Sequence, residues 1–174
     1  MKRAYLGDSY DAVKRLWQQA LAEWIPLYAE PLFIPKDLRA EFTCLTAIPM
    51  LHAEVSRPFS ILNDPDTGIR LPGQGNQAES RKHIALRTIH GQLKPNAASL
   101  VVTFDQSDYR QSGLKLAEQR ETKLRCLAEA GVSALYYVSH APFMFACVDA
   151  NLREQLRQRL LTVGIPNSRL ETCD

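Results

Sequence analysis

The 174-residue sequence lacks the features that would place it in a membrane or outside the cell. No apolar run approaches the roughly 20 residues that a membrane-spanning helix needs, and residues 1–8 hold no apolar stretch typical of a secretory signal. The net charge of +2 excludes a histone-like polycation but is compatible with a local basic groove. We therefore expect a cytoplasmic protein without a membrane partner.

Several catalytic and metal-binding motifs are also missing. The four cysteines form no CxxC pair and no Cys/His spacing of a zinc site, which predicts free thiols. There is no GxxxxGK[ST] motif, so a P-loop NTPase is not indicated, and no G-x-S-x-G nucleophile elbow is present. Gly73 and Gly75 follow no predicted strand, so they do not form a dinucleotide-binding fingerprint.

Apolar runs and segments of helical spacing alternate along the chain, whose 45% hydrophobic content is that of a globular protein. Strands are predicted at 3–6, at 25–33 on an edge, at 59–62 and at 99–104, with an antiparallel pair at 133–139 and 143–149. Helices are predicted at 13–24, 78–93, 112–130 and 151–162. We therefore expect one α/β domain over 1–174. Its predicted architecture is a Rossmann-like three-layer sandwich, with a mainly parallel sheet and a C-terminal antiparallel hairpin.

Polar clusters end four of the predicted strands, at residues 7–11, 64–68, 105–108 and 139–140. The carboxyl ends of parallel strands meet at one edge of a sheet, where open α/β proteins bind their ligands. We therefore expect the first three clusters to converge in space. The fourth joins them if its strand runs in the same direction.

The clusters supply carboxylates from separate strand ends. Hard divalent cations prefer such oxygen ligands and also accept substrate phosphates, whose developing charge they stabilise. This chemistry predicts a site for Mg²⁺ or Mn²⁺. The candidate ligands are Asp8, Asp64, Asp66 and Asp105.

Other residues of the same loops suit acid–base chemistry or contact with a substrate. The candidate catalytic residues are Asp64, Asp105, Lys123 and His140, the last as a general acid or base. The candidate substrate-binding residues are Lys14, Lys82, Gln106, Ser107, Arg110 and Ser139. Lys14, Lys82, Arg110 and Lys123 suit a phosphate, so nucleic acid or a nucleotide is the expected partner.

Each of these residues also has a purely structural interpretation. Asp8 or Asp11 is a suitable helix N-cap. The run from Asp64 to Gly68 is an acceptable turn, and Asp105 suits a turn or a cap. The functional interpretation therefore depends on the joint pattern and not on any one member.

The strand-end motifs resemble those of a family of bacterial and phage hypothetical proteins. The motifs are GDSYD at 7–11, DPDTG at 64–68, FDQS at 104–107 and YVSHAPF at 137–143. The resemblance implies that these loops act together, and it implies no particular activity.

Two more distant resemblances concern the same loops. The strand order with a late hairpin is similar to methyltransferase-like Rossmann folds, and Asp64-Pro65-Asp66 then takes the place of an Asp-Pro-Pro-aromatic motif. Position 66 departs from that motif, and the predicted first strand lacks a glycine-rich loop. The Asp64-x-Asp66 pair is also similar to that of toprim-like metal-dependent nucleases, although Asp8 stands where those carry Glu.

Three functions therefore remain open at the level of the sequence. The first is a metal-dependent phosphoesterase or nuclease that uses the acidic cluster. The second is a methyltransferase-like protein, active or degenerate. The third is a non-enzymatic binding protein, such as a phage or host-defence accessory.

Overall fold

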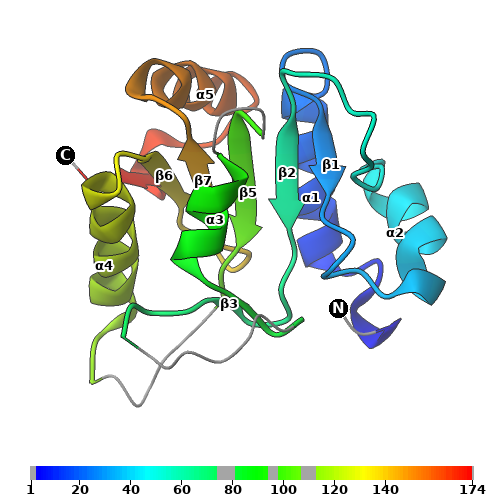
Figure 1. Ribbon diagram of the computed structural model, residues 1–174, viewed down its shortest axis with the longest axis horizontal. Helices are drawn as coiled ribbons and strands as arrows, with labels where there is room; N and C mark the ends of the chain where they lie inside the picture. The colour runs from blue at the N-terminus through cyan, green and yellow to red at the C-terminus, as the bar shows by residue number, and fades with distance from the viewer. Residues whose placement is uncertain (1–2, 74–80, 94–97, 107–112, 174) are drawn as a thin grey trace.

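The computed structural model describes residues 3–73, 81–93, 98–106 and 113–173 (Figure 1). Its centre is a six-stranded sheet with the order β1-β2-β5-β7-β6-β8. The strands are β1 (Leu27–Ala29), β2 (Ser60–Asn63), β5 (Leu100–Phe104), β6 (Ser133–Tyr137), β7 (Phe143–Cys147) and β8 (Leu170–Thr172). The protein is therefore mixed α/β, as predicted.

Four of the six strands point in one direction, so the sheet is mainly parallel. β1, β2 and β5 pair in parallel. β7 then pairs antiparallel with both β5 and β6, which returns β6 to the direction of β5. The carboxyl ends of β1, β2, β5 and β6 therefore meet at one edge, where the loops gather below the sheet in Figure 1.

Helices cover both faces of the sheet because successive strand residues alternate between two cores. Val102 belongs to the core under α1 (Ser9–Leu21), α2 (Arg39–Thr46) and α5 (Ala150–Thr162). Its neighbour Val101 belongs to the core under α3 (Leu86–Gln92) and α4 (Leu116–Glu129). Every residue of β5 and β7 is buried, as expected for central strands that are covered on both sides.

A second sheet of two short parallel strands lies beside the carboxyl ends. It consists of β3 (Gly68–Ile69) and β4 (His83–Ile84), which sequence patterns did not predict. Ile69 and Ile84 are fully buried, so this sheet attaches the loop after β2 to the core.

The first predicted strand is wrong. Residues 3–6 were expected to form a strand, but Arg3–Tyr5 is a single 3-10 turn, η1. The segment has few residues, and the outer edge of β1 is already occupied by a bridge between Ala29 and Met50. Gly7 then turns the chain into α1 with a positive φ of 79°.

Most of the other elements lie close to their predicted places. The helix predicted at 78–93 is wrong in its first half, because β4 occupies His83–Ile84 and α3 starts only at Leu86, while residues 78–80 lie outside the described ones. The region 36–57 holds η2 (Lys36–Leu38) and α2. The antiparallel end of the sheet has three strands and not two, because β8 follows η4 (Asn167–Arg169) and pairs with β6.

Cys44, Cys126, Cys147 and Cys173 are all free thiols, as predicted. Within the described ranges, no helix has the length and apolar character needed to cross a bilayer.

Candidate functional site

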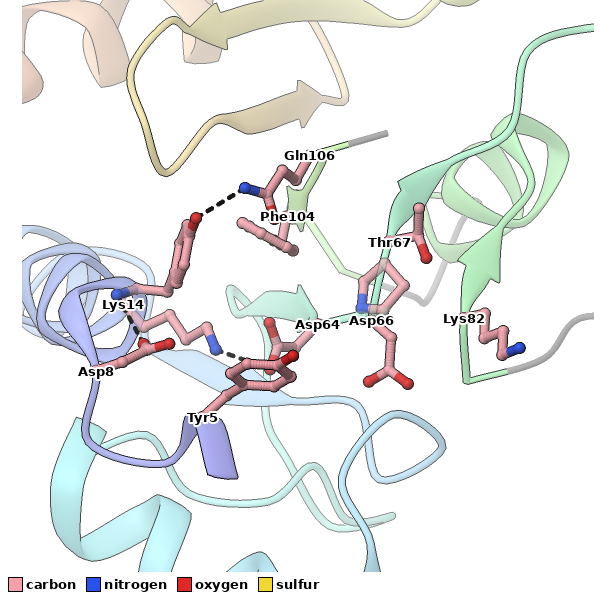
Figure 2. Close-up of a pocket in the computed structure, with 11 residues that line it drawn as sticks. Tyr5, Asp8, Lys14, Asp64, Asp66, Thr67, Lys82, Phe104 and Gln106 are labelled. Atoms are coloured by element: carbon pink, nitrogen blue, oxygen red, sulfur yellow. Dashed lines mark hydrogen bonds and ion pairs between the residues drawn. The ribbon is translucent and has the colours of Figure 1, made fainter. Parts of the chain in front are cut away.

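A cavity of about 400 Å³ lies at the carboxyl edge of the parallel strands (Figure 2). It is bounded by η1, the start of α1, the loop after β2 and the end of β5. Its lining residues are Tyr5, Asp8, Tyr10, Lys14, Asp64, Pro65, Asp66, Thr67, Lys82, Phe104 and Gln106. Three of the predicted clusters therefore contribute to one cavity, which we call the first cavity.

A lysine between two carboxylates forms one wall of the first cavity. The Lys14 ammonium donates to Asp11 Oδ1 at 2.9 Å and to Asp64 Oδ2 at 2.8 Å. All three side chains are buried, and Figure 2 shows Lys14 and Asp64 pointing toward one another. The second oxygen of Asp11 accepts the backbone N–H of Gly7 at 2.8 Å. We call these three side chains the Lys14 cluster.

The Lys14 cluster sets one ammonium group against two buried carboxyl groups. Burial by itself lowers the pKa of Lys14, but Asp64 and Asp11 together outweigh it, so the pKa is raised and the ammonium is retained. Burial raises the pKa of Asp64, and Lys14 only partly offsets this effect. One cation thus serves two buried carboxylates, and a further positive charge in the cavity would stabilise the cluster.

Asp8 has the structural role that its position predicts. It is the N-cap of α1, where its Oδ1 accepts the backbone N–H groups of Tyr10 at 2.9 Å and of Asp11 at 3.3 Å. It still lines the first cavity, on the side opposite Asp66 and Lys82 in Figure 2.

A second cavity, of about 300 Å³, adjoins the first through Gln106, which lines both. It lies between the end of β5, the start of α4 and the loop after β6. Its lining residues are Asp105, Gln106, Leu116, Gln119, Arg120, Lys123, Tyr136, Val138, Ser139, His140 and Pro142. The amide of Gln106 donates to the hydroxyl of Tyr10 at 2.7 Å, which bridges β5 and α1 between the two cavities.

Asp105 is the centre of a second buried cluster. Its Oδ2 accepts the Lys123 ammonium at 2.7 Å, and its Oδ1 accepts the backbone N–H of Ile69 at 2.8 Å. The Tyr136 hydroxyl shares its proton between the backbone carbonyl of Asp105 at 2.9 Å and Oδ2 at 3.1 Å. We call Asp105, Lys123 and Tyr136 the Asp105 cluster. Burial lowers the pKa of Lys123 in spite of the opposing effect of Asp105, and burial raises the pKa of Tyr136.

Gly68 allows the loop after β2 to reach this cluster. Its φ of 134° is open to glycine, and a Cβ there would overlap Asp105 Oδ1 and lie 2.8 Å from Asp105 Cα. The close approach places the N–H of Ile69 on Asp105. Asp105, which lines the second cavity, is thus bonded to the loop whose earlier residues line the first cavity.

Asp8, Asp64 and Asp105, which were predicted to share a metal ion with Asp66, each bond to another part of the protein. Asp64 is bonded to Lys14, Asp105 to Lys123, and Asp8 to the first turn of α1. In the parts of the chain that the structure describes, no group of three or more His, Cys, Asp or Glu residues is placed to hold a metal. Lys14 thus lies beside Asp64 and Lys123 beside Asp105, where the prediction set an ion, and the site for Mg²⁺ or Mn²⁺ stays a prediction.

The remaining predicted residues are distributed over both cavities. Lys82 and the exposed Asp66 line the first cavity, while Lys123, His140 and Ser139 line the second. Ser139 is engaged locally, since its hydroxyl donates to the carbonyl of Ala141 at 2.8 Å. Ser107 and Arg110 lie outside the described residues.

Sequence reasoning missed several residues of the two clusters and cavities, among them Asp11, Tyr136, Arg120 and the aromatic residues Tyr5, Tyr10 and Phe104. Asp11 was considered only as a cap, and Tyr136 and Arg120 were not considered. The i,i+3 spacing of Asp11 and Lys14 on one helix was an available signal for the ion pair. Tyr136 lies inside an apolar strand, and no local pattern distinguishes a buried tyrosine that bonds a carboxylate from one that only packs.

Comparison with known proteins adds no relative. No protein family, no curated protein and no solved structure matches this chain. The function is therefore argued from the two cavities alone.

Proposed function

We propose that the first cavity binds a small organic ligand that joins a ring system to a positively charged group. Within this class, S-adenosylmethionine is the ligand we propose, which makes the chain a methyltransferase-like protein, active or degenerate. The observation that carries the proposal is one cavity that combines aromatic walls with an excess of carboxylates at the carboxyl edge of the sheet.

The aromatic walls suit a flat ring. Tyr5, Tyr10 and Phe104 all line the first cavity. The rings of Tyr10 and Phe104 pack edge to face, with centroids 5.4 Å apart, which holds their orientation. Tyr5 is 57% exposed, so its ring is accessible to a bound molecule. Stacking a base on such a ring is worth about 1–3 kcal/mol.

The charge of the first cavity suits a cation. Asp8, Asp64 and Asp66 line it, against Lys14 and Lys82. Lys14 is already committed to Asp64 and to Asp11 behind the wall. The buried negative charge of the Lys14 cluster therefore favours a ligand that brings a positive group to Asp64.

Features of the fold support the proposal of a Rossmann-like, methyltransferase-like arrangement. Helices pack on both faces of the sheet, and the consecutive strands β6 and β7 form an antiparallel pair beside the parallel strands. Asp64-Pro65-Asp66 directly follows β2, as the resemblance requires. The departure is that β1 is followed by Glu30 and Pro31 and not by a glycine-rich loop.

Titration calorimetry with S-adenosylmethionine, S-adenosylhomocysteine and adenosine tests the proposal. We expect saturable binding of S-adenosylmethionine, with weaker binding of the other two ligands because they lack the sulfonium charge. At 100 times its dissociation constant, the ligand also stabilises the fold by about 2.7 kcal/mol in a thermal-shift assay. The absence of binding at millimolar ligand would overturn the proposal.

Two surface variants locate the ligand without unfolding the protein. Tyr5→Ala removes the accessible ring, and Asp66→Asn removes an exposed carboxylate, so each weakens binding by about tenfold. The matched control is Glu54→Gln, an exposed carboxylate that does not line the first cavity. If all three variants bind S-adenosylmethionine with equal affinity, the ligand does not bind in the first cavity.

A metal-dependent phosphoesterase is the second candidate, because three of the four predicted carboxylates do line the first cavity. Calorimetry with Mg²⁺ and Mn²⁺ distinguishes it from the first proposal. Metal binding that disappears in Asp64→Ala would favour the phosphoesterase. Metal-independent binding of S-adenosylmethionine would favour the methyltransferase-like protein.

A further inference from the structure

We infer that the second cavity is a separate binding site for an anionic group, a phosphate or a carboxylate. The inference does not depend on the ligand of the first cavity, because it concerns different side chains and a different charge. It rests on the charge of the second cavity, on the geometry of Arg120 and on the wall that the two cavities share.

The described side chains that line the second cavity carry an excess of positive charge. Arg120 and Lys123 are cationic, Asp105 is the anionic member, and His140 stands exposed at the margin. Lys123 and Asp105 form an ion pair at 2.7 Å, so they neutralise one another. The charge of Arg120 is the excess that remains within this set.

The partner of Arg120 lies outside the lining of the second cavity. Arg120 donates from Nε to Glu171 Oε2 at 2.9 Å and from Nη2 to Glu171 Oε1 at 3.0 Å. Glu171 belongs to β8, and its side chain is 43% exposed, so solvent screens its charge. A guanidinium has five N–H donors and Glu171 accepts from two, so three donors extend beyond this ion pair.

The guanidinium is also held in a fixed orientation. The bidentate pair with Glu171 sets its plane, and its Cζ lies 5.7 Å from the centre of the Tyr136 ring. Tyr136 in turn is fixed through its hydroxyl on Asp105. An arginine that is already oriented loses less conformational entropy on binding an anion, and its planar fork matches phosphate and carboxylate oxygens.

The two cavities therefore differ in the sign of the charge that they attract. The first exposes mainly carboxylates and the second an arginine, and Gln106 lies between them. An anion in the second cavity would lie next to the molecule in the first without competing for its charged groups. This arrangement suits a second ligand, or the anionic end of a long one.

Two substitutions that break the same ion pair test the inference. Arg120→Gln removes the positive charge from the second cavity. Glu171→Gln keeps that charge and removes its neutralising partner. A purely structural role for the ion pair predicts similar losses of anion affinity in both variants, whereas an anion site predicts a loss in Arg120→Gln and none in Glu171→Gln.

Inorganic phosphate and acetate are the probes, each titrated at constant ionic strength against chloride. The readout is the NMR shift of the Arg120 Nε–H group and of the backbone amides of Val138 and His140. We expect saturable shifts, an affinity reduced at least about tenfold in Arg120→Gln, and an affinity equal or higher in Glu171→Gln. Arg87→Gln, an exposed arginine on α3, is the matched control and leaves the affinity unchanged.

The possible outcomes separate the two anions and the two proposals. Saturation by phosphate alone, or by acetate alone, identifies the anion. Shifts that do not saturate, or equal losses in Arg120→Gln and Glu171→Gln, would overturn the inference. Because neither probe resembles S-adenosylmethionine, the anion site can fail while the ligand of the first cavity binds, and the reverse also holds.

Discussion

Among the described residues, the buried lysines Lys14 and Lys123 have different carboxylate partners. Lys14 is bonded to both Asp11 and Asp64, whereas Lys123 pairs, within the described residues, with Asp105. Burial lowers the pKa of both ammonium groups, but the pKa of Lys14 is raised overall and that of Lys123 is lowered. The number of anionic partners, and not burial alone, therefore decides how firmly a buried lysine keeps its proton.

The two clusters also differ in the groups that bond their buried carboxylates. In the Lys14 cluster, two carboxyl groups share one ammonium group, and Lys14 and Asp64 line the first cavity. In the Asp105 cluster, the carboxylate is satisfied by a lysine, a tyrosine hydroxyl and a backbone N–H. The first cluster depends on its cation, while the second spreads its bonds over several donors.

Removing the two lysines in turn gives the largest expected effect. Lys14→Met leaves Asp11 and Asp64 buried without their cation, which costs about 3–5 kcal/mol of unfolding free energy. Lys123→Met leaves Asp105 its bonds to Ile69 and Tyr136, so we expect a smaller loss of about 1.5–3 kcal/mol. Urea unfolding at pH 7 measures both.

Arg125→Met is the control for these variants, because Arg125 is an exposed cation on the same helix as Lys123. We expect a change within about 0.5 kcal/mol. Equal losses in Lys14→Met and Lys123→Met would contradict the distinction between the two clusters.

A substitution at Gly68 perturbs the Asp105 cluster and leaves the Lys14 cluster bonded. Gly68→Ala places a methyl group against Asp105 at a φ of 134°, so overpacking and backbone strain add to a loss of about 2–4 kcal/mol. Gly131→Ala is the control, since Gly131 has a φ of 77° but nothing within 4 Å of its Cβ position. We expect about 1 kcal/mol there, and an equal loss at both positions in urea unfolding would argue against the close approach.

The dependence of stability on pH gives the smallest and most discriminating effect. The pKa of Lys123 is lower in the folded than in the unfolded chain, so the unfolded state binds more protons in alkaline solution and this lysine adds stability as the pH rises toward 10.5. The pKa of Lys14 is raised, so its contribution is complete below 10.5 and is lost only above that value.

Urea unfolding between pH 7 and 10 compares wild type with each methionine variant. The stability of wild type relative to Lys123→Met rises across this range, whereas its stability relative to Lys14→Met stays constant. A constant stability difference between wild type and Lys123→Met across this pH range would contradict this interpretation. A stability difference between wild type and Lys14→Met that changes with pH would also contradict it.

Much of the fold could be predicted from local patterns in the sequence. The run from Leu100 to Phe104 is apolar except for Thr103, which is typical of a central strand, and all five residues are buried. The helix over 13–24 and the strand pair at 133–149 likewise follow from their spacing. The 3-10 turn at Arg3–Tyr5 was not predicted. A short apolar segment forms a strand only if it lies beside a free sheet edge, and its local sequence does not show that position.

The candidate site was predicted in its position but not in its chemistry. Asp64, Asp66, Asp105 and Gln106 follow strands that are neighbours in the sheet, so order along the chain was sufficient to bring them to one edge. Their partners could not be predicted in the same way. Lys14 and Asp64 are 50 positions apart, and no local pattern links them.

The sequence by itself therefore determined the α/β class, the central strands and the edge at which polar loops collect, because these depend on apolar periodicity and on strand–loop order. The tertiary structure alone decided that Lys14 lies beside Asp64 and Lys123 beside Asp105. It also decided that this edge holds two cavities, which meet at Gln106. The physical reason is that ion pairing between buried side chains depends on distances of about 3 Å, which packing sets and chain order does not.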